Sequence, residues 1–138
     1  MVDNLRPGGW LLIEDADPAL QPLACPDAQS PAELLANKVR DGFRTLMVHR
    51  GVDLAYGRKL PRLLRIAGLS DVMAEGFFPL GGPVCARLER ATVEMLRTEL
   101  VAAGLASADE IDDHLSNITN GRLDLTTAPM ISAWGRKP

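Results

Sequence analysis

The sequence lacks features that several classes of protein depend on. Its 138 residues include two cysteines, Cys25 and Cys85, which are too far apart in the chain for a zinc or redox pair. The 15 basic and 18 acidic residues are interspersed, so the chain has no basic stripe that could neutralise a phosphate backbone. We therefore expect both cysteines to be reduced bystanders, and we expect no nucleic-acid partner.

Long apolar runs are also absent. No run approaches the roughly 20 residues that cross a bilayer, and Asp3 and Arg6 stand where a secretion signal would place its apolar region. These absences predict a soluble, cytoplasmic protein with no membrane partner. With 46% apolar and 24% charged residues, the chain can build one domain with a modest core.

The N-terminal part is expected to hold one strand and one long loop. Residues 10–13 form a continuous apolar run between a Pro-Gly-Gly turn at residues 7–9 and the acidic pair Glu14 and Asp15. This pattern predicts a strand buried on both faces, as in a sheet covered by helices. Three prolines between residues 16 and 29 disfavour helix, so a loop follows the strand.

Caps and spacing predict four helices and two further strands. Ser30 with Glu33, and Ser107 with Glu110, form capping-box patterns that open helices over residues 31–50 and 107–118. Apolar residues at helical spacing predict helices over 59–67 and 84–103, and alternating apolar residues predict strands over 72–78 and 128–134. The fold class is therefore α/β. Because an open sheet of three strands leaves an edge uncovered, we expect a missing part upstream.

Three segments resemble a known family. Residues 5–15, LRPGGWLLIED, resemble the turn and fifth strand of Rossmann-like (class I) S-adenosylmethionine-dependent methyltransferases. Residues 57–61, GRKLP, with 67–72, AGLSDV, resemble the helix and sixth strand, and residues 133–138, AWGRKP, resemble the seventh strand of a bacterial, actinobacterial-like subgroup. The resemblance covers essentially the whole chain. It implies a partial sheet of about three strands, two parallel and the terminal one antiparallel, with four helices.

The resemblance implies the C-terminal, substrate-side region of such an enzyme, as a single region over residues 1–138. In the family, a Gly-x-Gly-x-Gly loop and an acidic residue at the end of the second strand hold S-adenosylmethionine, and no Gly-x-Gly occurs in this chain. A complete cofactor site cannot be drawn from the chain alone, and no cofactor-binding residue is assigned. The parent reaction would be methyl transfer to a small organic acceptor, and we expect this truncated chain to be inactive alone, which leaves open whether it is an enzyme.

Four residues are candidates for binding the acceptor. Glu14 and Asp15 end the first strand, where ligands of open α/β sheets lie. Tyr56 and Arg58, in a loop before a helix, could contact an anionic or aromatic substrate. The alternative, which we favour, is structural: Asp15 and Asp17 end a strand and bond nearby amides, and the Tyr56 loop is a turn.

The other polar and aromatic residues receive structural roles, and no catalytic residue is assigned. His49 suits a helix C-terminus, and His114 is predicted at the surface of an acidic helix. Trp10 and Trp134 are expected in the core. The acidic residues of that helix have no metal-loop spacing, so no metal is predicted; they are Asp109, Glu110, Asp112 and Asp113.

A second function stays open. An unpaired edge strand is a template for another chain, so the protein could be a non-catalytic dimerisation or interaction module that pairs through its open sheet edge. Its partner would be a second copy or a separate N-terminal half.

Overall fold

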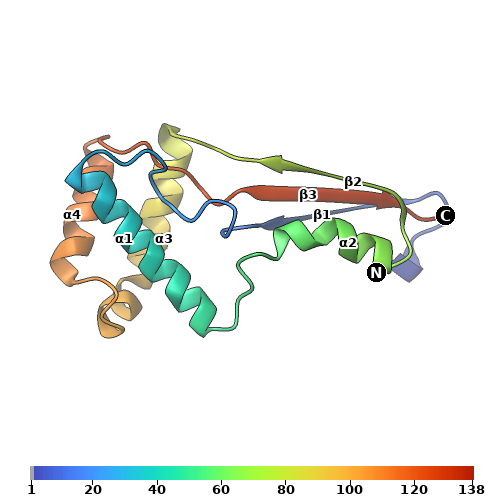
Figure 1. Ribbon diagram of the computed structural model, residues 1–138, viewed down its shortest axis with the longest axis horizontal. Helices are drawn as coiled ribbons and strands as arrows, with labels where there is room; N and C mark the ends of the chain where they lie inside the picture. Colours follow the sequence, from blue (N-terminus) through green and yellow to red (C-terminus); the bar gives the residue numbers. More distant parts are fainter. Residues whose placement is uncertain (1) are drawn as a thin grey trace. The chain divides into compact units, whose positions relative to one another are not determined.

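The computed structural model describes residues 2–138, whose contacts divide the chain into two compact units. The first contains the chain up to Leu20, Leu54–Phe78 and Ala128–Pro138, and the second contains Gln21–Asp53 and Pro79–Thr127. Figure 1 shows the first as the sheet with helix α2 (Leu60–Ile66) and the second as a group of helices. The single domain expected from the sequence stays a prediction.

The first unit is built on a three-stranded sheet. Its strands are β1 (Trp10–Ala16), β2 (Ser70–Phe77) and β3 (Met130–Arg136), in the order β1-β3-β2. The terminal strand is antiparallel to both neighbours, as predicted. No parallel pair of strands is confirmed within residues 2–138, because β3 lies between β1 and β2; those two strands run in the same direction on either side of it.

One face of this sheet is covered by helix α2 (Leu60–Ile66), which follows the 3-10 turn η2 (Gly57–Lys59). The core between them contains Leu60, Leu64, Leu69 and Ala133. β3 approaches this core closely at Gly135, where a Cβ would lie 3.0 Å from Val72 Cγ2 and 3.1 Å from Leu69 Cβ. The short helix therefore packs on the middle strand of the sheet.

The expectation that β1 is buried on both faces is wrong. Trp10 and Leu12 point to the face away from α2 and are 56% and 58% exposed. Trp10 is therefore not a core residue, whereas Trp134 on β3 is half-buried. Glu14 and Asp15 lie in the last part of β1, as predicted, and the strand runs one residue further to Ala16 because its backbone pairing with β3 continues to Met130.

The second unit packs three helices, α1 (Pro31–His49), α3 (Gly82–Ala102) and α4 (Ala108–Thr119). Both predicted capping boxes are present, since Ser30 and Ser107 accept from the backbone N–H groups of Glu33 and Glu110, whose carboxylates return the bond. The helices meet at a core of buried apolar side chains: Val39, Leu46, Val93, Leu96, Leu100, Ala106 and Ile111. Together with α2, these are the four predicted helices.

The loop before α1 has a small core of its own. Cys25 and Cys85 are both free, buried thiols within it. Asn37 fixes the loop, because its Nδ2 donates to Cys25 O at 3.0 Å and its Oδ1 accepts from Cys25 N at 2.8 Å. Across the described chain, residues 2–138, no helix has the length and apolarity needed to span a membrane.

Candidate functional site

The carboxyl end of β1 carries a charged contact with a fully buried carboxylate. Asp17, one residue beyond the strand, is fully buried. Arg58 in η2 donates to it twice, from Nε to Oδ2 at 2.8 Å and from Nη2 to Oδ1 at 2.6 Å. The backbone N–H of Arg58 adds a third bond to Oδ2 at 2.9 Å. A bidentate contact of this kind fixes the orientation of the guanidinium and also pairs the two charges.

Hydrogen bonds from Arg58 hold the pKa of the Asp17 carboxyl below its ordinary value of 3.8, against the opposing effect of burial. The backbone N–H of Leu20 also donates to Asp17 Oδ1, at 3.1 Å. Asp17 is therefore ionised at neutral pH and joins the end of β1 to η2.

Gly57 brings η2 directly against the sheet. A Cβ at this position would lie 3.0 Å from Asp15 O, 3.0 Å from Ile131 Cγ1 and 3.1 Å from Ala16 O. Only glycine leaves room for that approach. The turn therefore places Tyr56, which is 41% exposed, and Arg58, whose side chain is 44% exposed, beside the end of β1.

Three of the four predicted binding residues come together here, and one does not. Asp15, Tyr56 and Arg58 lie at the carboxyl end of β1, where Asp15 accepts from the N–H of Ala16 at 2.7 Å. Glu14 points to the opposite face of the sheet and accepts a hydrogen bond from the Ser132 hydroxyl. The structure thus separates Glu14 from the other three, and whether any of them binds an acceptor stays a prediction.

Asp17 is the residue of this cluster that the sequence did not identify as a partner of Arg58. The sequence suggested that it would bond nearby backbone amides, which it does at Leu20. Its ion pair joins positions 41 residues apart, and no local spacing signals such a contact. The cluster can present the Tyr56 phenol and the exposed part of the Arg58 side chain to an anionic or aromatic ligand, while Asp17 holds the guanidinium in place.

The second unit contains a buried charged network that was not predicted. His114 was expected at the surface, which is wrong: its side chain is fully buried, and its Nε2 lies 3.3 Å from Glu89 Oε1. Arg40 bonds the other oxygen of Glu89 and donates to Thr126 O at 3.0 Å. The network joins α1, α3 and α4.

Burial opposes ionisation of Glu89, but the hydrogen bond from His114 and the charge and hydrogen bond of Arg40 outweigh it, so the pKa of Glu89 lies below its ordinary value of 4.5. Because the three side chains bond one another in the interior and join three helices, we assign them a structural role. His114 Nδ1 is also buried, and no residue within 2–138 makes a hydrogen bond to it.

A shallow cavity of about 640 Å³ also lies in the second unit. Its lining comes from the start of α1, from α4 and from the loop after α4: Ser30, Pro31, Ala32, Leu35, Asp113, Ser116, Asn117 and Arg122. None of the four predicted binding residues lines it. Within residues 2–138, no group of three potential ligands from His, Cys, Asp and Glu could hold a metal ion.

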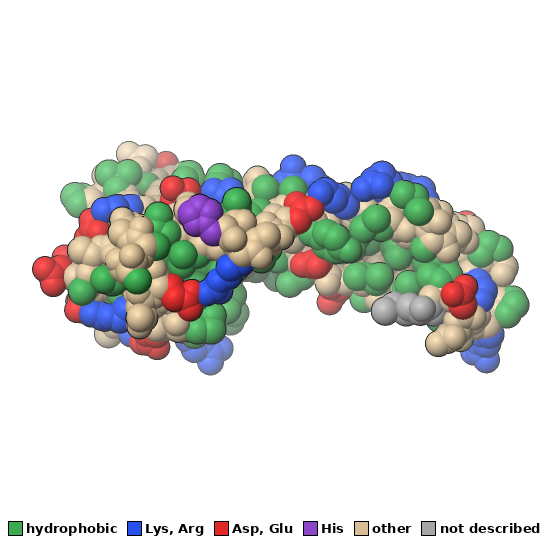
Figure 2. All heavy atoms as spheres, turned by 90° about the horizontal axis from the view of Figure 1, so that it is seen from below, with side chains coloured by type: hydrophobic (Ala, Val, Ile, Leu, Met, Phe, Trp, Pro, Cys, Tyr) green, Lys and Arg blue, Asp and Glu red, His purple; other side chains and the backbone are tan. Residues whose placement is uncertain are grey.

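Charged side chains mix with apolar ones over the surface. Figure 2 shows acidic and basic groups beside hydrophobic ones on the face that it presents. Several acidic and basic side chains form ion pairs, as Arg97 on α3 and Asp112 on α4 do across 2.5 Å in the second unit. This arrangement agrees with the interspersed charges of the sequence.

No family model matches the chain, and no curated protein matches it. Among solved structures, one that it is similar to is phosphoethanolamine N-methyltransferase 2 of Haemonchus contortus, in complex with phosphomonomethylethanolamine and S-adenosylhomocysteine. The identity is 17% and the TM-score is 0.41. The match covers 99% of this chain but only 28% of that one, so the chain spans little more than a quarter of its length.

Proposed function

We propose that the chain is the substrate-side region of a methyltransferase-like domain that moves a methyl group from S-adenosylmethionine to a small organic acceptor. The proposal rests on the order of the elements. The three segments that resemble the fifth, sixth and seventh strands of the family form β1, β2 and β3, and the helix expected before the sixth strand forms α2. The placement of the antiparallel terminal strand is the observation that carries it.

The acceptor would lie at the carboxyl end of β1. Ligands of open α/β sheets bind beyond the carboxyl ends of their strands, and Asp15, Tyr56 and Arg58 gather at that end. The Asp17 carboxylate would keep Arg58 oriented, so that Tyr56 and the exposed part of the Arg58 side chain receive the acceptor. Orientation of this kind is a large part of the rate enhancement in transfer reactions.

The cofactor would be held by polypeptide outside these 138 residues. The chain contains no Gly-x-Gly sequence, so it offers no loop of that kind for the methyl donor. We propose that a cofactor-binding half, of bacterial type and cytoplasmic like this chain, adds to the sheet at β1. Neither region alone would transfer methyl groups.

A methyl-transfer assay tests this function. The chain would be mixed with the cofactor-binding half of a bacterial methyltransferase of the resembled family, with isotope-labelled S-adenosylmethionine and a panel of small acids, amines and phenols. Label should move to an acceptor in the mixture only. Tyr56→Phe or Arg58→Ala should raise the KM for the acceptor, whereas Arg62→Ala, an exposed change on α2, should not. A mixture no more active than the cofactor half would contradict the proposal.

A second candidate function is association without catalysis. β1 and β2 each pair with β3 alone among the described strands, so both outer edges of the sheet lack a neighbouring strand. Such edges favour addition of another chain. Sedimentation of the isolated chain tests this alternative, because a strictly monomeric, well-folded protein would contradict it.

A further inference from the structure

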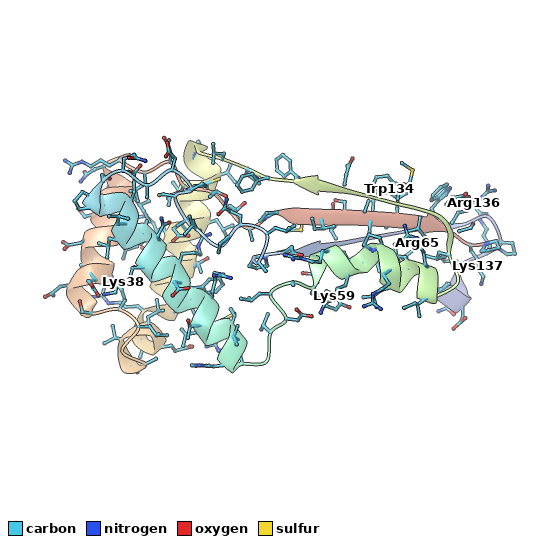
Figure 3. All side chains as sticks on the ribbon, in the orientation of Figure 1. Lys38, Lys59, Arg65, Trp134, Arg136 and Lys137 are labelled. Carbon is cyan, nitrogen blue, oxygen red and sulfur yellow. The ribbon has the colours of Figure 1, made fainter. Side chains whose placement is uncertain are left out.

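The face of the sheet away from α2 forms an exposed, mostly apolar surface, here called the open face. Paired residues of neighbouring strands share a face, so the register places its side chains in rows across the three strands. The middle row is Leu12, Trp134 and Met73. On one side of it lie Trp10 and Arg136, and on the other lie Glu14, Ser132 and Glu75, followed by a further row of Ala16, Met130 and Phe77. Figure 3 labels Trp134 and Arg136 on β3.

The open face exposes more apolar surface than scattered residues would. The five large side chains that contribute most are Trp10 at 56%, Leu12 at 58%, Met73 at 61%, Phe77 at 68% and Met130 at 39% exposure. At roughly 200 Å² for a large side chain, they leave on the order of 550 Å² of apolar surface in one patch, within the range that marks an interaction site.

We propose that the open face packs against the open face of a second copy of this chain. In the orientation argued below, the rows that overlap contain Trp10, Leu12 and Met73. Two such faces would remove roughly 700 Å² of apolar surface from water, together with the polar side chains of the same rows, an area typical of weak, transient association. Sheets pack face to face in this way at about 10 Å separation.

The charges of the open face select this occupant and its orientation. Arg136 lies one row to one side of the apolar middle row, and Glu14 and Glu75 lie one row to the other side. A two-fold axis that crosses the strands at Trp134 places the middle rows on each other. It also places Arg136 of each copy over the Glu14, Ser132 and Glu75 row of its partner.

The other two-fold arrangement is unfavourable. An axis that runs along the strands places each row on the same row of the second copy, so that Glu14 meets Glu75 and Arg136 meets Arg136. Like charges brought together across an interface oppose association. The surface therefore carries its own complement in one orientation only, as a two-fold interface requires. This pairing differs from association through a strand edge, and it does not depend on methyl transfer.

Sedimentation equilibrium of the whole chain at low salt tests the proposal. The chain should be dimeric at roughly 100 µM, and Met73→Lys should weaken the dimer about tenfold or more, because it buries a charge in the middle row. Ile66→Lys is the matched control: Ile66 is 70% exposed, on α2 at the opposite face, and its replacement should leave the dimer unchanged. Circular dichroism confirms that both variants fold.

A charge exchange tests the orientation. Arg136→Glu should weaken the dimer, and adding Glu14→Arg and Glu75→Arg to the same chain should restore it to within about threefold. Thermal unfolding of each variant reports any damage to the turn at Gly8, whose carbonyl accepts from Arg136 Nε. A monomer at every concentration, equal effects of Met73→Lys and Ile66→Lys, or no restoration by the triple variant would each overturn the proposal.

Discussion

Arg58 binds Asp17 through Nε and Nη2 of its guanidinium and through its own backbone N–H. These hydrogen bonds join the end of β1 to the turn that precedes α2. Every residue proposed to receive the acceptor lies within this joint or next to it. Its integrity therefore determines both the stability of the first unit and the geometry of the proposed site.

Loss of the Arg58 side chain should destabilise the protein. Arg58→Ala leaves the buried Asp17 carboxylate with backbone donors only, and we expect a loss of about 2–3 kcal/mol in the free energy of unfolding. Arg58→Lys keeps the charge and loses the bidentate geometry, so its free energy of unfolding should lie between those of the wild type and the alanine variant. Denaturant unfolding measures both, with Arg62→Ala as the control. A loss for Arg58→Ala no larger than that for the control would show that the pair contributes nothing.

The same pair predicts a dependence of stability on pH. Because the pKa of Asp17 is lower in the folded protein than its ordinary value of 3.8, its ionisation stabilises the fold fully above that value. The stabilisation is lost as pH falls through the folded pKa. Thermal unfolding between pH 2 and 7 should show a smaller decline below about pH 4 for Asp17→Asn than for wild type. Parallel curves would contradict this assignment.

Glu89 should be among the most sensitive positions of the second unit. Glu89→Gln removes the carboxylate that Arg40 and His114 share in the interior, and breaking a buried ion pair costs about 3 kcal/mol or more. Glu94→Gln, in the same helix but 53% exposed and 3.4 Å from Arg90, should cost less than about 1 kcal/mol. Equal losses in urea unfolding would exclude a special role for the network.

Two glycines of the first unit should respond differently to alanine. Gly57→Ala places a methyl group 3.0 Å from Asp15 O and should cost about 1–3 kcal/mol, with a raised KM in the transfer assay because η2 moves. Gly76→Ala meets only Ile131 Cδ1, at 3.4 Å, and should be neutral or slightly stabilising. Thermal unfolding compares the stabilities of the two variants. A Gly57→Ala variant as stable as the wild type would contradict close packing of the turn against β1.

Neither cysteine should react in the folded protein. Burial raises the pKa of the Cys25 thiol to about 12, so at pH 8 it is almost wholly protonated, and Cys85 is equally inaccessible. Labelling with a disulfide reagent should be slow in buffer and complete in denaturant. Rapid labelling of either thiol in buffer would contradict the packing of the loop before α1.

Local signals predicted the helices well. The capping boxes at Ser30 and Ser107 identified the starts of α1 and α4 because the cap, its partner three residues on and the first turn all lie within a few residues. The same locality explains the success with α2 and α3. The strands were located to within a few residues, as β3 shows: it begins at Met130 and extends to Arg136.

Non-local contacts account for what the sequence did not reveal. Burial of β1 on one face only depends on α2 and β3, and the contact between Glu14 and Ser132 spans 118 positions. His114 was assigned to the surface from its acidic neighbours, although its spacing from Ile111 and Ile118 places all three on the buried face of α4. That helical spacing was a usable signal. No comparable signal in the sequence identified the Asp17–Arg58 pair.

Calorimetric titration with S-adenosylmethionine tests the central claim most directly. If the chain supplies only the substrate side of a methyltransferase-like domain, the isolated chain should give no binding heat. An equimolar mixture with the cofactor-binding half should bind the compound more tightly than that half alone. Micromolar binding by the isolated chain, or identical affinities for the half and the mixture, would contradict the claim.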